Sequence, residues 1–218
     1  MINSGPMMFE LDMRLPERVR TELISRVMRF PQFKAIVINA AYQSQRITKN
    51  EYTNNFEMPP YLVADNIHEY KKSNGKEGNI RNAYGLFSTN NGWYGAGNVS
   101  SEIGKIKAQV AAKNLKIVVK GVMCKEDALE AIGNGADAIW ISNQGGAKAH
   151  SSPSSISVLK SISRAVKSCR KPETEIFIDS AITRGTDALK CLAYGANAVF
   201  IGRPIMWALN YNGQLGCE

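Results

Sequence analysis

A polar loop with two adjacent glycines follows an apolar run within residues 138–150, AIWISNQGGAKAH. The run ends in Ser142, Asn143 and Gln144, whose side chains donate and accept hydrogen bonds. The glycine pair that follows allows a tight turn or the approach of a ligand to the backbone. This arrangement is typical of the mouth of a binding or catalytic site. Gln144 stands where a catalytic loop needs a proton acceptor, and an amide cannot act as a general base near neutral pH.

Alternating strands and helices are predicted to position this loop. Short apolar runs bounded by turn residues predict six strands, over 9–13, 34–39, 116–120, 138–142, 175–179 and 198–202. Apolar residues at helical spacing and cap signals predict helices over 16–30, from Ser100 or Ser101 to about 114, over 125–135, near 154–169, over 186–195 and in a short stretch after 202. Strands buried on both faces that alternate with helices indicate a parallel α/β fold.

An internal repeat supports this fold class. The segments NGADAIWIS and YGANAVFIG both place Gly-Ala-Asp/Asn-Ala between a helix and a strand. Gly135 and Gly195 are therefore expected to end their helices in a left-handed conformation. Polar residues at the carboxyl ends of the strands favour a TIM-type (β/α)₈ barrel over a doubly wound sheet, and no GxGxxG follows a strand. Because a closed barrel of this type needs eight strands, we expect an incomplete barrel.

Composition limits the partners of the chain. It has 218 residues, 21% of them charged, and a formal net charge of +8. The basic residues are scattered and match no nucleic-acid-binding motif, so we expect a solvated basic surface, with a phosphate-bearing ligand as the alternative and no nucleic-acid partner. No apolar run approaches the roughly 20 residues that span a bilayer, so no membrane partner is expected. Glu10, Asp12 and Arg14 exclude an apolar signal-peptide core near the start, which indicates an intracellular protein.

The chain is expected to form one domain over residues 1–218. Residues 40–98 are poor in periodic pattern and are interpreted as a long excursion. The four cysteines are widely spaced without a CxxC pair, which indicates reduced, structural thiols and no metal site.

Five segments share a pattern with one known family: FKAIVIN (33–39), FEMPPYL (56–62), IVVKGV (117–122), ISNQGG (141–146) and DSAITRGTDALKCLAYGANAVFIGRP (179–204). In these segments the chain resembles the FMN-dependent α-hydroxy-acid oxidases and dehydrogenases, which include glycolate oxidase, whereas a stretch around 63–98 diverges. The resemblance implies a (β/α)₈ barrel that is matched from about its third strand to just past its eighth. It also implies FMN as the cofactor, and a reaction in which a 2-hydroxy acid is oxidised to a 2-oxo acid by hydride transfer to the flavin, while O₂ is reduced to H₂O₂.

Several positions that contact the flavin in this family keep their residue types. By the resemblance, Lys120 lies against the pyrimidine edge of the ring and stabilises the anionic reduced flavin, and Ser142 hydrogen-bonds the ring. Gly202 and Arg203 match a phosphate-binding pair, where barrels of this type commonly hold phosphate. Asp179 matches the acidic residue that fixes the ribityl chain.

Other flavin positions are altered. The family sequence Asp-Gly-Gly, aliphatic, Arg is here Asp179, Ser, Ala, Ile and Thr183, followed by Arg184. Side chains therefore occupy positions where backbone approaches the ligand, and a phosphate-binding cation has become a hydroxyl, although Arg184 can be considered as a substitute. Glu10 replaces a glutamine that contacts the flavin, and Asn39 replaces a threonine and can keep a hydrogen bond.

The catalytic positions of the family are replaced throughout. Gln144 occupies the place of the histidine base, and Ala41 that of the aspartate that orients it. Thr48 and Ala147 stand in place of the two arginines that bind the substrate carboxylate, and Asp12 in place of a tyrosine that hydrogen-bonds it. An aspartate here repels a carboxylate substrate. The resemblance therefore implies a site whose family chemistry is lost.

Neighbouring residues offer weak substitutes. Lys148 lies next to one lost arginine position and could meet a carboxylate, while His150 and His68 are interpreted as loop histidines. Three hypotheses stay open: a degenerate family member with FMN binding weakened or lost, an FMN-binding oxidoreductase with an uncharged or cationic substrate, and a non-flavin phosphate-ligand or interaction module.

The incomplete barrel also leads to expectations about assembly and location. Two exposed sheet edges are a liability for association, so a homo-oligomer is expected through them. The sequence is compatible with a fragment or isoform of a longer protein. It ends in LGCE rather than the peroxisomal Ser-Lys-Leu type of signal, so either the peroxisome of the family or the cytoplasm is expected.

Overall fold

The computed structural model describes residues 5–13, 15, 17–40, 99–146 and 151–218, and the structural statements below concern these residues. The divergent stretch 63–98 lies outside them. So do six single positions considered above: Ala41, Thr48, His68, Ala147, Lys148 and His150.

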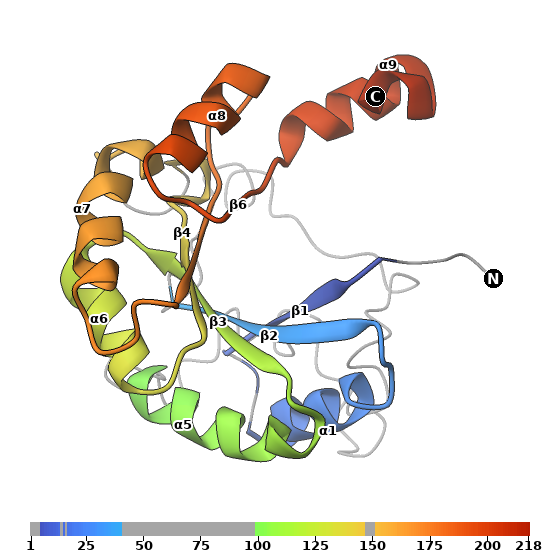
Figure 1. The fold of residues 1–218 in the computed structure, drawn as a ribbon. Coiled ribbons are helices and arrows are strands. Elements are labelled where there is room, and N and C mark those ends of the chain that lie inside the picture. The colour runs from blue at the N-terminus through green and yellow to red at the C-terminus, as the bar shows by residue number, and fades with distance from the viewer. Residues whose placement is uncertain (1–4, 14, 16, 41–98, 147–150) are drawn as a thin grey trace, which may run out of the picture.

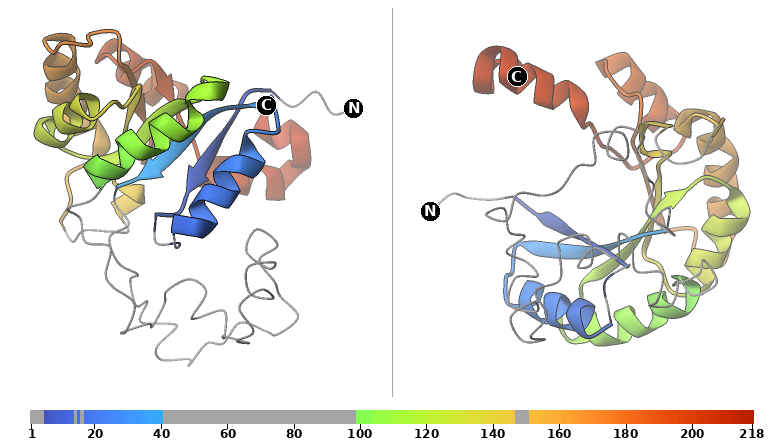
Figure 2. Two further views of the ribbon diagram at one scale, coloured as in Figure 1. Left: turned by 90° about the horizontal axis from the view of Figure 1, so that it is seen from below. Right: turned by 180° about the vertical axis from the view of Figure 1, so that it is seen from behind.

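Six parallel strands form one sheet whose spatial order follows the chain. The strands are β1 (Met7–Leu11), β2 (Phe33–Asn39), β3 (Lys116–Val122), β4 (Ala138–Ile141), β5 (Glu175–Ile178) and β6 (Ala198–Val199). The helices are α1 (Glu17–Val27), α5 (Val99–Val110), α6 (Lys125–Gly133), α7 (Ser155–Lys167), α8 (Gly185–Ala193) and α9 (Arg203–Cys217). The sheet is curled, with α1, α5, α6 and α7 in an arc along its outer side (Figures 1 and 2). The predicted parallel α/β fold and incomplete barrel are confirmed.

Alternate residues of each strand face two different apolar layers. One layer joins Ile38, Val119 and Ile139 of the sheet to the apolar faces of the outer helices, including Leu159 and Ile162 of α7. The second layer lies on the other face of the sheet and holds Ala35, Val37, Val118, Ala138 and Phe177, with Trp140, Ala198 and Phe200 packed against them. Burial on both faces explains why these strands read as continuous apolar runs.

The internal repeat fixes the entry into two strands. Gly135 and Gly195 both have φ +106°, as predicted for residues that end a helix in a conformation favouring glycine. Two positions after each of these glycines stands a residue whose side chain reaches the preceding strand: Asp137 in one copy and Asn197 in the other. The Asp137 carboxylate accepts the Ile117 N–H at 2.9 Å, and the Asn197 side-chain oxygen accepts the Ile176 N–H at 2.8 Å. The two copies thus anchor β4 to β3 and β6 to β5 in the same way.

Most elements differ from the sequence prediction by a few residues at one or both ends, and three of these differences are described here. The first strand was expected at 9–13 but is Met7–Leu11, because its pairing with β2 runs from Met7 to Leu11 and Asp12 then accepts a turn bond from the Leu15 N–H. The strand expected at 198–202 is only Ala198–Val199, since β5 ends at Ile178, which pairs with Val199. The stretch after 202 is not short: α9 spans 15 residues, with a kink at Asn212 and Gly213.

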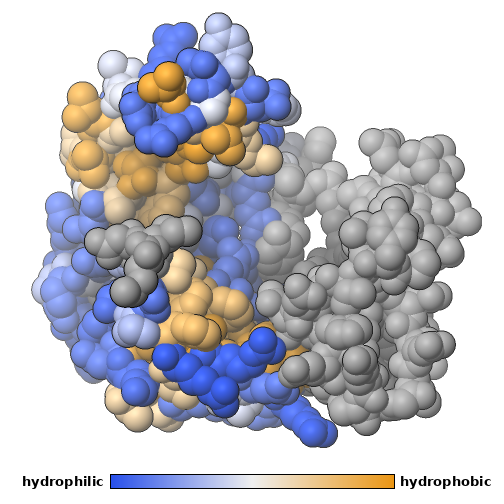
Figure 3. Space-filling view, turned by 90° about the vertical axis from the view of Figure 1, so that its right-hand side faces the viewer, coloured by the Kyte–Doolittle hydropathy of each residue, from blue (hydrophilic) through white to orange (hydrophobic). Residues whose placement is uncertain are grey.

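The sheet has an open side. Within the described residues, β1 and β6 each pair with a single neighbour. Figure 1 shows β1 and α9 on opposite sides of the opening, and Figure 3 looks onto this side, where apolar surface is visible among polar side chains. Among the helices in the described ranges, none is long and apolar enough to cross a membrane.

Candidate active site at the carboxyl ends of the strands

Polar side chains from several strands meet at the carboxyl end of the sheet. In a parallel sheet the ends of all strands share one edge, and barrels of this type place their chemistry there. The residues concerned are Glu10, Asn39, Lys120, Ser142, Gln144, Asp179 and Arg203. The sequence prediction that these strand ends surround one site is consistent with the contacts described below, whereas their roles toward FMN stay predictions.

Glu10 is the centre of a hydrogen-bond network across β1, β2 and β3. Its carboxylate accepts the Asn39 side-chain N–H at 2.8 Å and the Lys120 ammonium at 2.9 Å. The Asn39 oxygen in turn accepts the Gln144 side-chain N–H at 3.1 Å. Asn39 is 2% exposed, so its amide is held rigidly between the two partners. The network thus links the side chains of four residues from three strands and the loop after β4.

Lys120 is positioned by an irregularity in its strand. Gly121, with φ +95°, follows it, and the register with β4 shifts between Lys120 and Val122. Bulges of this kind redirect side chains and are frequent at functional sites. The Lys120 ammonium lies 4.9 Å from the centre of the Trp140 ring, which stacks on Phe200 at 4.0 Å. Lys120 therefore contacts a carboxylate and an aromatic ring at once.

The loop after β4 is held by hydrogen bonds between its side chains and backbone groups. Ser142 is buried, and its hydroxyl accepts the Gln144 N–H at 3.2 Å. Gln144 adopts φ +53°, and Gly145 and Gly146 follow with φ +66° and +77°. The Asn143 side chain accepts the Gly146 N–H at 3.1 Å and donates to the Pro153 carbonyl at 3.0 Å, outside the network around Glu10. Gln144 thus presents an amide donor to Asn39 and no group that can take a proton.

The loop after β5 keeps an unusual backbone despite its side chains. Ser180 and Ala181 have φ +80° and +59°, a region that favours glycine. The Ser180 hydroxyl donates to the Asp179 carboxylate at 2.8 Å and accepts the Gly145 N–H at 3.1 Å. Ser180 therefore connects the β5 loop to the β4 loop, a role that the sequence analysis missed because no periodic pattern signals it.

Thr183 and Arg184 belong to the start of α8. Their backbone N–H groups donate to the Asp187 carboxylate at 3.3 and 3.1 Å. The bond from Thr183 is the larger cause that lowers the pKa of Asp187 below its ordinary value. Both side chains are exposed. Their backbone contacts cap the helix.

Ala181 offers a direct test of backbone strain in this loop. Its Cβ disfavours the left-handed conformation by about 1–2 kcal/mol, partly offset by the greater freedom that glycine has in the unfolded chain. Ala181→Gly is therefore expected to raise the free energy of unfolding by about 0.5–1 kcal/mol, measured by urea denaturation. The control Ala108→Gly, in the interior of α5, is expected to lower it by about 1 kcal/mol. Equal effects of both variants would contradict strain at Ala181.

Arg203 connects the last helix to the same loops. It is the first residue of α9, after Gly202 at the N-cap. A Cβ at Gly145 would meet the end of the Arg203 side chain, which is flexible and can move aside. Glycine is therefore favoured at this position by its positive φ. An exposed arginine at a helix N-terminus is a favourable place for a phosphate group.

The residues present fit the phosphate end of FMN better than its ring end. Arg203 and the N-terminus of α9 carry the positive charge that a phosphate needs. Ser142 offers a buried hydroxyl for the ring. At the ring end, however, the Lys120 charge is already compensated by Glu10 at 2.9 Å. Lys120, Ser142 and Arg203 could hold the cofactor, and Glu10 is the residue that departs from such a site.

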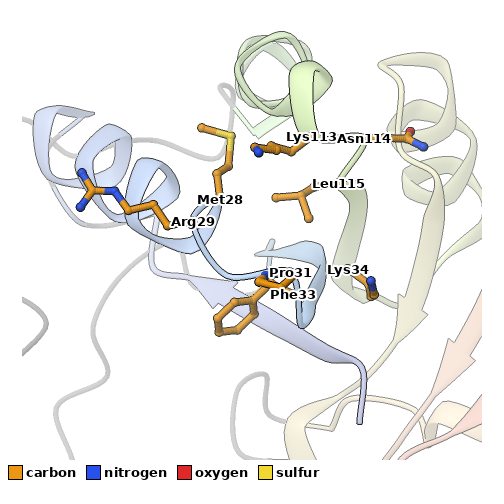
Figure 4. Close-up of a pocket in the computed structure, with 8 residues that line it drawn as sticks. All are labelled: Met28, Arg29, Pro31, Phe33, Lys34, Lys113, Asn114 and Leu115. Carbon is orange, nitrogen blue, oxygen red and sulfur yellow. The ribbon is translucent and has the colours of Figure 1, made fainter. Parts of the chain in front are cut away.

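A pocket of about 600 Å³ lies at the opposite end of the strands. Its walls come from the turn after α1, the start of β2 and the segment just before β3 (Figure 4): Met28, Arg29, Pro31, Phe33, Lys34, Lys113, Asn114 and Leu115. None of the polar residues gathered at the carboxyl ends contributes to it. Since barrels of this type carry their chemistry at the carboxyl ends, we do not assign this pocket to the candidate site.

Asp12 and Trp140 also lie near the candidate site; Asp12 was predicted as a substrate position, and Trp140 was not. Asp12 follows β1 directly and is half-buried, with its carbonyl in the turn to Leu15. Trp140 was read only as part of an apolar strand. Trp140 lies two residues after Ala138 and therefore on the same face of β4, the face on which Lys120 contacts it. This two-residue spacing was the available signal.

Comparison with known proteins shows the family of this chain. The model of the FMN-dependent dehydrogenase family matches residues 2–218. 2-Hydroxyacid oxidase 1 of Mus musculus is 34% identical over 190 residues, which cover 85% of this chain and 48% of that protein. Glycolate oxidase 5 of Oryza sativa subsp. japonica is 32% identical over 214 residues, which cover 97% of this chain and 54% of that protein.

A solved structure shows the same fold. A lactate oxidase of Pediococcus acidilactici superimposes with a TM-score of 0.76 and 27% sequence identity, covering 97% of this chain and 52% of that one. The chain thus spans about half the length of the relatives that it matches. With the family model matched over nearly all its residues, the chain belongs to the FMN-dependent dehydrogenase family.

Proposed function

We propose that this chain is a member of its family that does not carry out the oxidation of 2-hydroxy acids and that holds FMN weakly or not at all. The observation that carries the proposal is Gln144. Its side-chain amide donates to Asn39 at 3.1 Å in the position that the family resemblance assigns to a histidine base. An amide in this network cannot accept the proton that leaves the hydroxy acid.

The expected losses in rate and in substrate binding are large enough to favour loss of the reaction over reduced activity. Removal of a general base typically costs about 10²–10⁴-fold in rate. Thr48 and Ala147 cannot replace two arginines, each of whose charge-assisted bonds contributes about 1.5–3 kcal/mol. Ala41 cannot orient a base. These losses act on one catalytic unit and are not additive, but five replacements at once leave no residue of the set to compensate.

Part of the machinery for the cofactor persists. When bound, FMN supplies the acceptor for the hydride of the substrate. Arg203 would hold its phosphate, Ser142 would donate to the ring, and Lys120 would supply positive charge at the pyrimidine edge. The contacts of Lys120 with Glu10 work against the last role.

Turnover measurements test the proposal. With FMN added in excess, the purified chain is expected to form no H₂O₂ from glycolate, L-lactate or a longer 2-hydroxy acid above the rate of free FMN with the same substrate. The absence of a base and of carboxylate-binding arginines is the physical reason. A rate above this background with any of these substrates would refute the proposal.

The persistence of Lys120, Ser142 and Arg203 favours one second candidate, an FMN-binding oxidoreductase with an uncharged or cationic substrate. Asp12 would repel a carboxylate but not such a molecule. A yellow purified protein with one FMN per chain and no turnover of 2-hydroxy acids would favour this candidate over a degenerate site.

A further inference from the structure

We propose that Glu10 is a built-in anionic occupant of the site, which pairs with the Lys120 charge, takes up one donor each of Lys120 and Asn39, and thereby weakens the binding of a flavin ring. The inference deepens the proposed function, because it concerns the same site. It rests on the contacts of Glu10: one carboxylate oxygen receives the Asn39 amide at 2.8 Å and the other the Lys120 ammonium at 2.9 Å.

One donor of Asn39 and one of Lys120 are turned toward the Glu10 carboxylate. The pyrimidine edge of a flavin presents carbonyl oxygens, which are acceptors and require N–H or O–H donors. Asn39 uses one of its two side-chain N–H donors on Glu10 and its oxygen on Gln144. A neutral carbonyl oxygen must therefore compete with a carboxylate, and bonds to an ionised acceptor are roughly twice as strong as bonds to a neutral one.

The positive charge of Lys120 is paired with the Glu10 carboxylate, and the ammonium also lies over the Trp140 ring. Lys120 is 17% exposed and lies over Trp140, so the pair with Glu10 is only partly screened by water. Its net positive field toward a ligand is small as long as the carboxylate stays in place. A ligand that gains negative charge at this edge receives less stabilisation from the site.

Exposure makes Glu10 the replaceable member of the network. Its side chain is 42% exposed, whereas Asn39, the last residue of β2, is 2% exposed. Glutamine at position 10 has nearly the same size and can still accept a hydrogen bond through its amide oxygen. Glu10→Gln therefore removes the charge without leaving a cavity, and the variant is expected to fold as the parent chain does.

The test compares FMN binding by the full chain, Glu10→Gln and a charge-matched control. Glu175→Gln makes the same change in net charge at the start of β5, the opposite end of the sheet. In a fluorescence-quenching titration, Glu10→Gln is expected to bind FMN at least about ten-fold more tightly than the parent chain, and Glu175→Gln like the parent. Equal or weaker binding by Glu10→Gln, including no binding by either protein, would overturn the proposal.

Riboflavin locates the effect at the ring. Because riboflavin lacks the phosphate, its affinity is expected to rise by the same factor in Glu10→Gln, whereas a gain confined to FMN would show a general charge effect and overturn the assignment. In the double variant Glu10→Gln with Lys120→Gln the gain is expected to disappear. Persistence of the gain would mean that Lys120 is not the group that Glu10 blocks.

Failure of this proposal and failure of the proposed function are distinguishable. Oxidation of a 2-hydroxy acid by the parent chain would refute the proposed function, but it would leave the ratio of flavin affinities as the measure of Glu10. An unchanged ratio would refute the role of Glu10, but it would say nothing about the base position at Gln144.

Discussion

Glu102→Ala is expected to lower the free energy of unfolding by about 3 kcal/mol, because it leaves the Arg20 guanidinium buried without this carboxylate. Arg20, on α1, is 4% exposed and donates to Glu102 of α5 at 2.7 Å; Glu102 is 14% exposed. The pair connects the helix after β1 to the helix before β3. Urea denaturation followed by circular dichroism measures the effect.

A second donor to the same carboxylate provides the control. Lys105 also lies 2.7 Å from Glu102, but its side chain is largely exposed. Lys105→Ala is therefore expected to change the free energy of unfolding by no more than about 0.5 kcal/mol. A loss in Glu102→Ala as small as that in Lys105→Ala would contradict the structural role assigned to the buried pair.

The pH dependence of unfolding gives a second readout on this carboxyl. Burial by itself raises the pKa of Glu102, but hydrogen bonds from Lys105 and Arg20 outweigh it and hold the pKa below its ordinary value of 4.5. As the pH falls, the unfolded chain therefore binds the proton first. The stabilisation is present above the unfolded pKa and is lost as the pH falls through the folded one. Glu102→Gln is expected to remove this part of the acid-dependent loss.

The sequence predicted the regular part of the fold because local rules determine it. Buried strands such as Phe33–Asn39 and Lys116–Val122 are continuous apolar runs, and Gly135 and Gly195 mark where helices end. The first strand was misplaced by two residues, because apolar pattern alone does not set the register of an edge strand. The pairing of Leu11 with Ile38 does.

That polar strand ends meet at one edge of the sheet was predictable, but the contacts between them were not. Parallel strands bring their carboxyl ends together, and the family resemblance assigned Glu10, Asn39 and Lys120 to one flavin site. That Glu10 pairs with Lys120, 110 residues away, depends on the side-chain direction of Lys120 next to the strand irregularity at Gly121, which no local pattern reports. The bond from Gly145 to Ser180 likewise depends on how two loops meet.

Self-association is expected through the open side of the sheet, and we propose a second copy of the chain as the partner. In the described ranges β1 and β6 pair on one side only, and a free strand edge is a template for another chain. The helix beside the opening, α9, exposes a group of large apolar side chains: Ile205, Met206, Trp207, Leu209, Tyr211 and Leu215. Exposed apolar groups of this kind mark association surfaces.

Trp207→Lys is expected to weaken this association, because it removes an exposed aromatic residue and adds charge to the surface. Central aromatic residues of interfaces commonly contribute about 2 kcal/mol or more, so a loss of roughly 30-fold in affinity is expected. Sedimentation velocity at increasing protein concentration measures it. Because the net charge of +8 repels a second copy, added salt is expected to strengthen the association.

The matched control is Leu129→Lys, an exposed leucine of α6 in the outer arc of helices, away from the opening. It makes the same change in charge and is expected to leave the association unchanged. If both variants weaken association equally, net charge rather than α9 is responsible. If the parent chain sediments as a monomer at every concentration, the open side does not bind a second copy, and the free edges of β1 and β6 are tolerated in solution.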